Sequence, residues 1–204
     1  RYATKNNISV SLGHSSATFE QVKQVVNSGA KVFVHTYNGM SPLNHREPGM
    51  VGAAMVLKDT YAELICDGHH VSPIAVKIMM DAKSSNNIAL ITDCMSAGAM
   101  EDGKYTLGKF NVNVKNSVAR LNSGSLAGSV LTMDKAVRNI VDWNISTLED
   151  AIKMATYVPA LSCNIDNVCG SIYQGMDADF IVTDNDFNIH ETYINGICMY
   201  KVNK

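Results

Sequence analysis

The sequence predicts an α/β fold in which parallel strands alternate with helices, and more closely half of a (β/α)8 barrel. His14 and His35 each follow a short β-branched, apolar run, and a segment with helical period lies between those runs. A third such run, residues 88–92, ends at Asp93. Strand–helix–strand order favours parallel pairing. The loops after parallel barrel strands converge at one rim, so these three side chains are expected there.

Composition bounds the kinds of partner. The chain has 204 residues, 46% of them hydrophobic, and a formal net charge of −2, which gives no general affinity for nucleic acid or acidic membranes. No apolar run of 18 residues occurs, and residues 1–5 are too polar for a signal peptide. The five cysteines form no C-x-x-C pair. We therefore expect reduced thiols and a cytoplasmic protein that binds neither nucleic acid nor membrane.

The first elements follow from local signals. The chain is expected to open almost directly into a strand over residues 8–12. Thr18 and Gln21 form a capping box, and Val22, Val25 and Val26 then mark one helical face. A second strand covers residues 31–34. The loop over residues 36–49 is long for a compact domain, and such loops are usually functional. A short helix is expected over residues 50–57.

The middle and end of the chain read in the same way. Residues 61–66 form a third strand, and Ser72-Pro73 opens a helix that runs to about residue 83. Residues 88–92 form the fourth strand, and short alternating runs indicate a β-hairpin insertion at about 103–122. Helices follow over residues 131–141 and, from a second capping box at Ser146 and Glu149, to about 157. Strands return at Ile172 and after, with an Asn195-Gly196 hairpin turn.

Four strand–helix units are half of what a closed barrel needs. The predicted domains are therefore the second half of a barrel over residues 1–165, with its insertion, and the strands of a small β-sandwich over residues 166–204.

The two histidines and the aspartate predict a metal-assisted hydrolase. Neutral imidazoles bind divalent ions, and a bound ion lowers the pKa of its water towards 7. A carboxylate beside that water can act first as base and then as acid, which is the role predicted for Asp93. The alternatives are structural: a histidine at one strand end is most often a hydrogen-bonded core or rim residue, and Asp93 can simply cap the following loop.

Arg46 and His70 predict an anion site, because a guanidinium fork matches phosphate oxygens. The alternative for Arg46 is an ordinary surface arginine. Residues 124–129, Gly-Ser-Leu-Ala-Gly-Ser, lack the spacing of a phosphate-binding P-loop. We interpret them as a close backbone approach to a ligand or as a turn before the next helix.

A set of motifs in fixed order resembles the N-acetylglucosamine-6-phosphate deacetylase family of the amidohydrolases: G-H-S-x-A-T, H-T-Y-N-G-M, N-x-R-E-P-G, C-D-G-x-H-V, L-I-T-D and L-A-G-S. The resemblance covers nearly the whole chain. It implies the C-terminal half of a metal-dependent (β/α)8 barrel with a small β-sandwich. It also implies hydrolysis of N-acetylglucosamine 6-phosphate to glucosamine 6-phosphate and acetate, within amino-sugar metabolism.

The resemblance assigns roles to residues of this chain. It makes His14 and His35 ligands of a divalent metal ion, zinc or iron before other metals, with one or two ions left open. It makes Asp93 the general base and acid. Substrate contacts fall to Asn38, Gly39, Arg46, His70, Leu126, Ala127, Gly128 and Ser129. The complete enzyme is expected to be a homodimer whose only other partner is the amino-sugar phosphate.

The chain departs from the family in one respect that bears on activity. The family's remaining metal ligand is a glutamate on an earlier barrel strand, and Glu20 in a helix and Glu63 in mid-strand are not expected to replace it. A smaller departure is Tyr157, where the family usually has asparagine. Two alternatives therefore stand beside the deacetylase: another metal-dependent amidohydrolase acting on a cyclic amide, and an inactive fragment that needs an N-terminal half.

Overall fold

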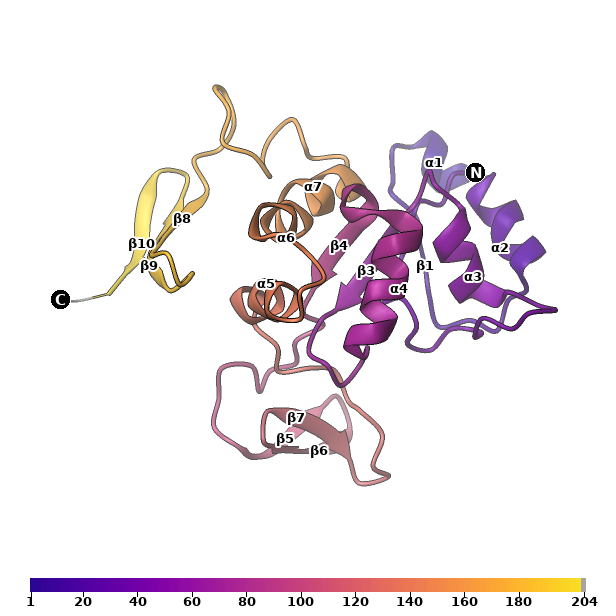
Figure 1. Ribbon diagram of the computed structural model, residues 1–204, viewed down its shortest axis with the longest axis horizontal. Helices are drawn as coiled ribbons and strands as arrows, with labels where there is room; N and C mark the ends of the chain where they lie inside the picture. Colours follow the sequence, from indigo (N-terminus) through magenta and orange to yellow (C-terminus); the bar gives the residue numbers. More distant parts are fainter. Residues whose placement is uncertain (203–204) are drawn as a thin grey trace.

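The computed structural model describes residues 1–202 as a parallel sheet covered by helices, with two small antiparallel sheets attached (Figure 1). The parallel sheet has the order β1-β2-β3-β4. Its strands are β1 (Ser11–Leu12), β2 (Val32–Phe33), β3 (Tyr61–Ile65) and β4 (Ile88–Ile91). Helices α2 (Phe19–Val26), α3 (Gly49–Val56) and α4 (Pro73–Lys83) connect them in turn, with a short 3₁₀ turn η1 (Ser85–Asn87) before β4. The predicted strand–helix alternation is confirmed.

The main core lies between one face of this sheet and the helices. Phe33, Ala62, Leu64 and Leu90 point to that face and pack with side chains from α2 to α6. The register places Tyr61 and Glu63 on the opposite face, where both are only half-buried. Because alternate residues of a strand face opposite sides, one face of β3 is sealed by helices and the other is partly open.

The helix starts obey the signals in the sequence. Thr18 and Gln21 form the expected capping box of α2, and Gln21 Oε1 accepts from the Thr18 N–H at 2.9 Å. Ser72 caps α4, with Pro73 at its first position. Glu47 joins two helices: its Oε1 accepts the N–H of Phe19 at 2.8 Å and of Gly49 at 3.0 Å, so one carboxylate serves the first residues of α2 and α3. These two hydrogen bonds hold the pKa of Glu47 below its usual value.

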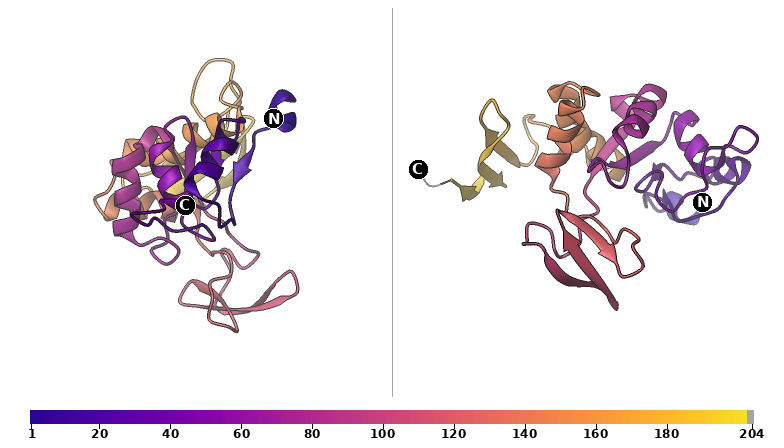
Figure 2. Two further views of the ribbon diagram at one scale, coloured as in Figure 1. Left: turned by 90° about the vertical axis from the view of Figure 1, so that its right-hand side faces the viewer. Right: turned by 60° about the horizontal axis from the view of Figure 1, so that its bottom comes forward.

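The remaining elements form the other half of the chain. Helices α5 (Met133–Asp142), α6 (Leu148–Ala155) and α7 (Tyr157–Cys163) pack near β4. One antiparallel sheet holds β5 (Gly103–Leu107), β6 (Phe110–Lys115) and β7 (Val118–Leu121), and the other holds β8 (Phe180–Thr183), β9 (Ile189–Ile194) and β10 (Ile197–Lys201). Figure 2 shows both small sheets projecting from the body of the molecule. The predicted boundary at residue 165 stays a prediction, and residues 203–204 of the second predicted domain lie outside the described residues.

Arg138 on α5 anchors the β8–β9 loop. One guanidinium nitrogen donates to the carbonyl of Phe187 at 2.8 Å and to Asn188 Oδ1 at 2.9 Å. Phe187 itself packs against the main core. The C-terminal sheet is therefore attached to the body through this loop as well as through the chain before β8.

Several expectations differ from the structure. The chain opens with a short helix, α1 (Tyr2–Lys5), and the first strand has only two residues, Ser11 and Leu12, where five were expected. The cap of α6 is Thr147, which accepts from Asp150 N–H, and not Ser146. The three strands of the insertion, by contrast, coincide with the short alternating runs of the sequence at about 103–122. Ile172 lies outside any strand and is 91% exposed.

The expected hairpin turn near the end of the chain agrees with the structure. The turn between β9 and β10 is formed by Asn195 and Gly196, both with positive φ (50° and 75°), as a two-residue hairpin loop requires. All five cysteines are free thiols. Within residues 1–202, no helix is both long enough and apolar enough to span a bilayer.

We expect truncation of two adjacent side chains on α4 to change the free energy of unfolding by different amounts. Met79 is fully buried in the main core, whereas its neighbour Ile78 is 50% exposed. Met79→Ala should lower the free energy of unfolding by about 2–5 kcal/mol, because it removes buried contacts and leaves a cavity. Ile78→Ala is the matched control and should stay within about 0.5 kcal/mol. Denaturant unfolding measures both, and equal losses would contradict the packing described.

We also expect residues 1–204, expressed alone, to be aggregated, oligomeric or partly unfolded. The parallel sheet ends in β1 and β4, and unpaired strand edges recruit other chains. Apolar side chains on the small C-terminal sheet add to this, since Ile197 and Met199 are each 64% exposed. Sedimentation velocity measures the outcome. A monodisperse monomer that unfolds cooperatively would contradict this prediction.

Candidate active site

The two predicted metal ligands lie side by side. His14 follows β1 and His35 follows β2, and their ring centroids are 4.7 Å apart with an edge-to-face angle of 89°. Pairing of β1 with β2 in parallel is what brings together two side chains 21 residues apart in the sequence. Gly39 completes this contact: it has φ of +62°, and a Cβ there would lie 2.8 Å from His14 Nδ1. Only glycine therefore fits at this position beside the ring.

The backbone is strained at the two predicted metal ligands and at the predicted general base. The φ angles are +43° at His14, +28° at His35 and +47° at Asp93. Non-glycine residues rarely adopt positive φ, and such strain costs of the order of 1–3 kcal/mol per residue. All three residues follow the ends of β1, β2 and β4, and backbone strain is common at functional sites, although turns elsewhere in the chain also have positive φ. No sequence pattern predicted this feature.

The surroundings of His35 fit a residue that binds a ligand or an ion. Its Nδ1 is buried, and no hydrogen-bond partner for it occurs within residues 1–202. A buried ring nitrogen without a partner is uncommon and calls for a ligand, an ion or a water. No group of three histidine, cysteine, aspartate or glutamate side chains spaced to hold a metal occurs in the same residues. The described part of the chain thus offers two imidazoles, and the glutamate ligand expected from an earlier strand stays a prediction.

Asp93 lies against the predicted Leu126–Ser129 segment. Its carbonyl accepts the N–H of Ser129 at 2.8 Å, and the Ser129 hydroxyl donates to the carbonyl of Thr92. Gly128 has φ of +61°, and a Cβ there would lie 3.2 Å from the Asp93 carbonyl oxygen. Asp93 and the Leu126–Ser129 segment were both predicted to belong to the site. The structure brings them together across 35 residues of intervening chain, while the Asp93 side chain stays exposed.

Glu63 is a neighbour that sequence reasoning set aside. Its Oε2 accepts the backbone N–H of His35 at 3.2 Å, from the open face of β3. Burial raises the pKa of this carboxyl, His35 lowers it and the charge of Asp93 raises it again, so that the net pKa lies above the usual value. The alternation of Ala62 and Leu64 with Glu63 was the signal available, because it directs Glu63 away from the helices.

His70 is held by a carboxylate after β3. Asp67 Oδ2 lies 2.6 Å from His70 Nδ1, and Asp67 Oδ1 accepts the N–H groups of His69 and His70, both at 2.8 Å. Burial raises the pKa of Asp67, but these hydrogen bonds outweigh burial and lower it below the usual value. Asp67 is therefore an ionised acceptor near neutral pH. It was not among the predicted site residues.

The other predicted substrate contacts lie on the loop after β2. Asn38 Nδ2 donates to the His35 carbonyl at 3.2 Å, which closes the turn around His35. Arg46 is exposed, and no ion pair with its guanidinium occurs within residues 1–202. Its fork is therefore free for an anion, although nothing in its contacts directs it to one.

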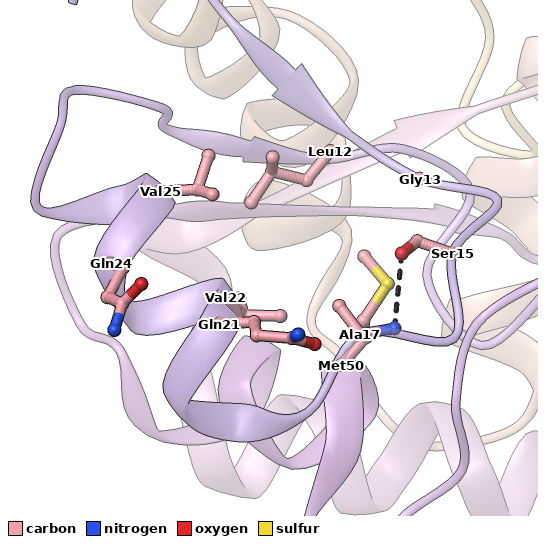
Figure 3. A pocket seen from close by; sticks show the side chains of 9 residues that line it. All are labelled: Leu12, Gly13, Ser15, Ala17, Gln21, Val22, Gln24, Val25 and Met50. Carbon is pink, nitrogen blue, oxygen red and sulfur yellow. Dashed lines mark hydrogen bonds between the residues drawn. The ribbon is translucent and has the colours of Figure 1, made fainter.

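A separate cavity of about 370 Å³ lies near His14 but does not include it (Figure 3). Its lining is mostly apolar and comes from β1, α2 and α3, with Leu12, Val22 and Met50 among its members. None of the predicted site residues lines it. Because its lining is mostly apolar and includes none of those residues, we do not assign it to substrate binding.

Comparison with known proteins agrees with this geometry. Residues 3–198 match the model of the amidohydrolase family. The N-acetylglucosamine-6-phosphate deacetylase of Vibrio furnissii is 44% identical over 96% of this chain and 49% of its own length. The N-acetylgalactosamine-6-phosphate deacetylase of Escherichia coli O157:H7 is 43% identical over 96% of this chain and 52% of its own. The chain thus spans about half the length of these curated relatives.

A solved structure gives the same result. The crystal structure of N-acetylglucosamine-6-phosphate deacetylase from Thermotoga maritima superposes with a TM-score of 0.93 at 38% sequence identity, and the match covers 98% of this chain and 55% of that one. The parallel strands with their helices and the two antiparallel sheets are therefore all parts of an amidohydrolase fold. With strand ends that present His14, His35 and Asp93, and a family model matched over residues 3–198, this chain belongs to the amidohydrolase family.

Proposed function

We propose that this chain carries most of the active site of a deacetylase that hydrolyses N-acetylglucosamine 6-phosphate to glucosamine 6-phosphate and acetate. The observation that carries the proposal is the contact between His14 and His35 at adjacent strand ends, with Asp93 two strands further on. The names of the similar deacetylases support the substrate class. By the complete enzyme we mean a polypeptide of the relatives' full length that contains these residues.

His14 and His35 would hold a divalent ion, with zinc or iron the proposed metals and one or two ions left open. Such an ion, when bound, lowers the pKa of a water to near neutrality. Asp93 would take a proton from the attacking water while the oxygen of that water bonds to the acetyl carbon. Asp93 then returns that proton to the amine nitrogen as the C–N bond breaks, which releases acetate and the amino sugar.

The substrate contacts form the second part of the proposal. Arg46 and His70 would bind the phosphate and sugar, with Asn38, Gly39 and the Leu126–Ser129 segment beside them. A phosphate matches the unpaired guanidinium fork of Arg46. This argues against the alternative of a neutral cyclic amide, which would leave Arg46 without a partner. The glutamate ligand would come from a segment that these residues do not supply, so the chain alone should be inactive.

The 4-epimer, N-acetylgalactosamine 6-phosphate, is a second candidate substrate. It is favoured by one specific observation, since the deacetylase named for that sugar is 43% identical, almost the same as the 44% of its counterpart. Both sugars share the acetamide and the phosphate and differ at one hydroxyl. The ratio of kcat/KM for the two sugar phosphates, measured on the complete enzyme, decides between them.

Assembly and location complete the proposal. We propose a homodimer, which sedimentation of the complete enzyme would test. A reducing compartment such as the cytoplasm fits the five free thiols.

Asp93→Asn tests the proposed chemistry. In the complete enzyme this variant should keep metal and substrate binding but lose kcat by orders of magnitude, because asparagine cannot accept the proton from water. Asp81→Asn is the control, since Asp81 is an exposed helical residue paired with Lys77. Steady-state release of acetate measures both. A kcat near that of the unmodified enzyme would refute the role of Asp93.

Arg46→Ala tests the phosphate contact. A charge-assisted, bidentate contact contributes about 1.5–3 kcal/mol, so kcat/KM for the sugar phosphate should fall by roughly one to two decades. Unphosphorylated N-acetylglucosamine should be nearly unaffected, and Arg46→Lys should recover part of the loss through its charge. Equal losses on both sugars would mean that Arg46 is structural.

A further inference from the structure

A short turn after β3 holds the ring of His70 from one side. Asp67 begins this turn, and its carboxylate makes three contacts: with the N–H groups of His69 and His70 through Oδ1, and with His70 Nδ1 through Oδ2. The side chains of Asp67 and His70 are 13% and 7% exposed. A contact of 2.6 Å between groups this well buried is that of a charge-assisted hydrogen bond.

The turn is anchored to the body and not free to move with the loop. The Cys66 carbonyl, just before Asp67, accepts from Asn139 Nδ2 on α5 at 2.8 Å. Gly68, which has φ of +76°, lies beside the ring of Trp143 at the end of α5. Asp67 is thus fixed relative to both β3 and α5. Because β3 is parallel to β1, β2 and β4, the turn lies at the same edge of the sheet as His14, His35 and Asp93.

The chemistry of the contact decides which ring nitrogen carries the proton. An ionised carboxylate has no proton to donate, so His70 Nδ1 must be the donor. Nε2 then has no proton in the neutral ring, and it has no hydrogen-bond partner within residues 1–202. A histidine whose Nδ1–H is bound to a carboxylate offers Nε2 in a fixed direction, which is how such pairs orient ligating or catalytic imidazoles.

We propose that Asp67 is a positioning residue, which fixes the tautomer and the orientation of His70 so that the unprotonated Nε2 accepts a hydrogen bond from a hydroxyl of the amino-sugar phosphate. Because Nε2 without a proton cannot donate to the phosphate, the phosphate contact itself is left to Arg46. This inference rests on the proposed function only in naming the ligand. The tautomer itself is a property of the ligand-free protein. Asp67 touches no reacting atom and acts through His70.

Asp67→Asn separates this role from a structural one. Asparagine keeps an amide oxygen that can accept the N–H groups of His69 and His70, so the turn should persist. Its nitrogen replaces Oδ2 and is a donor, so His70 Nδ1 must become an acceptor and the proton must move to Nε2. The variant thus reverses the tautomer while keeping the fold.

Asp184→Asn is the matched control. Asp184 also contacts a histidine, His190 Nε2 at 3.2 Å, and accepts the N–H groups of Asp186 and Asn188. That cluster is exposed, on the C-terminal sheet and its loop. This variant should alter the surroundings of His190 and leave catalysis unchanged.

The experiment uses the complete enzyme with ¹⁵N-labelled histidine. Long-range ¹H–¹⁵N spectra of the ligand-free protein should show His70 protonated at Nδ1, and protonated at Nε2 in Asp67→Asn, with Tm changed by no more than a few degrees. The kcat/KM for N-acetylglucosamine 6-phosphate should fall by about 10–100-fold, the usual effect of removing such a partner. Asp184→Asn should match the unmodified enzyme.

Two results would overturn the inference. His70 protonated at Nε2 in the unmodified enzyme would refute the tautomer. A reversed tautomer in Asp67→Asn with unchanged kcat/KM would show that Asp67 fixes a ring that does not serve the reaction. An unmodified enzyme without deacetylase activity would instead refute the proposed function, and His70 protonated at Nδ1 in the same spectra, reversed in Asp67→Asn, would still support the positioning role.

Discussion

The parallel register of β1 to β4 is the constraint on which the rest of the structure depends. Parallel strands hydrogen-bonded in sequence order place all four carboxyl ends at one edge. Each of these ends carries a residue of the candidate site: His14, His35, His70 and Asp93, in that order. The helices between the strands cover one face only, which leaves the open face to Glu63. The geometry of the site is therefore a consequence of strand direction, and no one loop builds it.

Carboxylates outside the proposed reacting set hold the loops in place. Glu47 accepts N–H groups at the starts of α2 and α3, Glu63 accepts the N–H of His35, and Asp67 accepts from His69 and His70. In each case one ionisable side chain satisfies a backbone donor that no strand or helix pairs. Because a carboxylate has up to four acceptor positions, it can close a turn that a neutral side chain would leave partly unsatisfied.

Backbone strain at the same edge has a structural counterpart. Two of the residues with positive φ, His14 and Asp93, lie where a glycine of a neighbouring loop packs closely. Gly39 lies against the ring of His14, and Gly128 against the carbonyl of Asp93. Strain of this kind is stable only where the surroundings fix the conformation. Gly39 and Gly128, which lie in two predicted substrate motifs, thus leave room for the histidine ring and the aspartate backbone.

The sequence by itself determined the local elements and their order. The capping box at Thr18, the Ser72-Pro73 helix start and the Asn195-Gly196 turn are local signals whose energies depend on neighbours within a few residues, and each is present in the structure. Alternation of strands and helices then gave the parallel sheet and the common edge for His14, His35 and Asp93. Where two local signals competed, as at Ser146 and Thr147, the prediction was one residue off.

Only the tertiary structure decided what those residues touch. The contact of Glu63 with His35, the pairing of Asp67 with His70 and the anchoring of the C-terminal sheet by Arg138 depend on strand register and loop path. Periodicity gives the face on which a side chain lies but not the neighbour it meets across the sheet. Glu63 was set aside because a mid-strand position says nothing about the adjacent strand. Such pairings become visible only when the chain is folded, because residues distant in sequence make them.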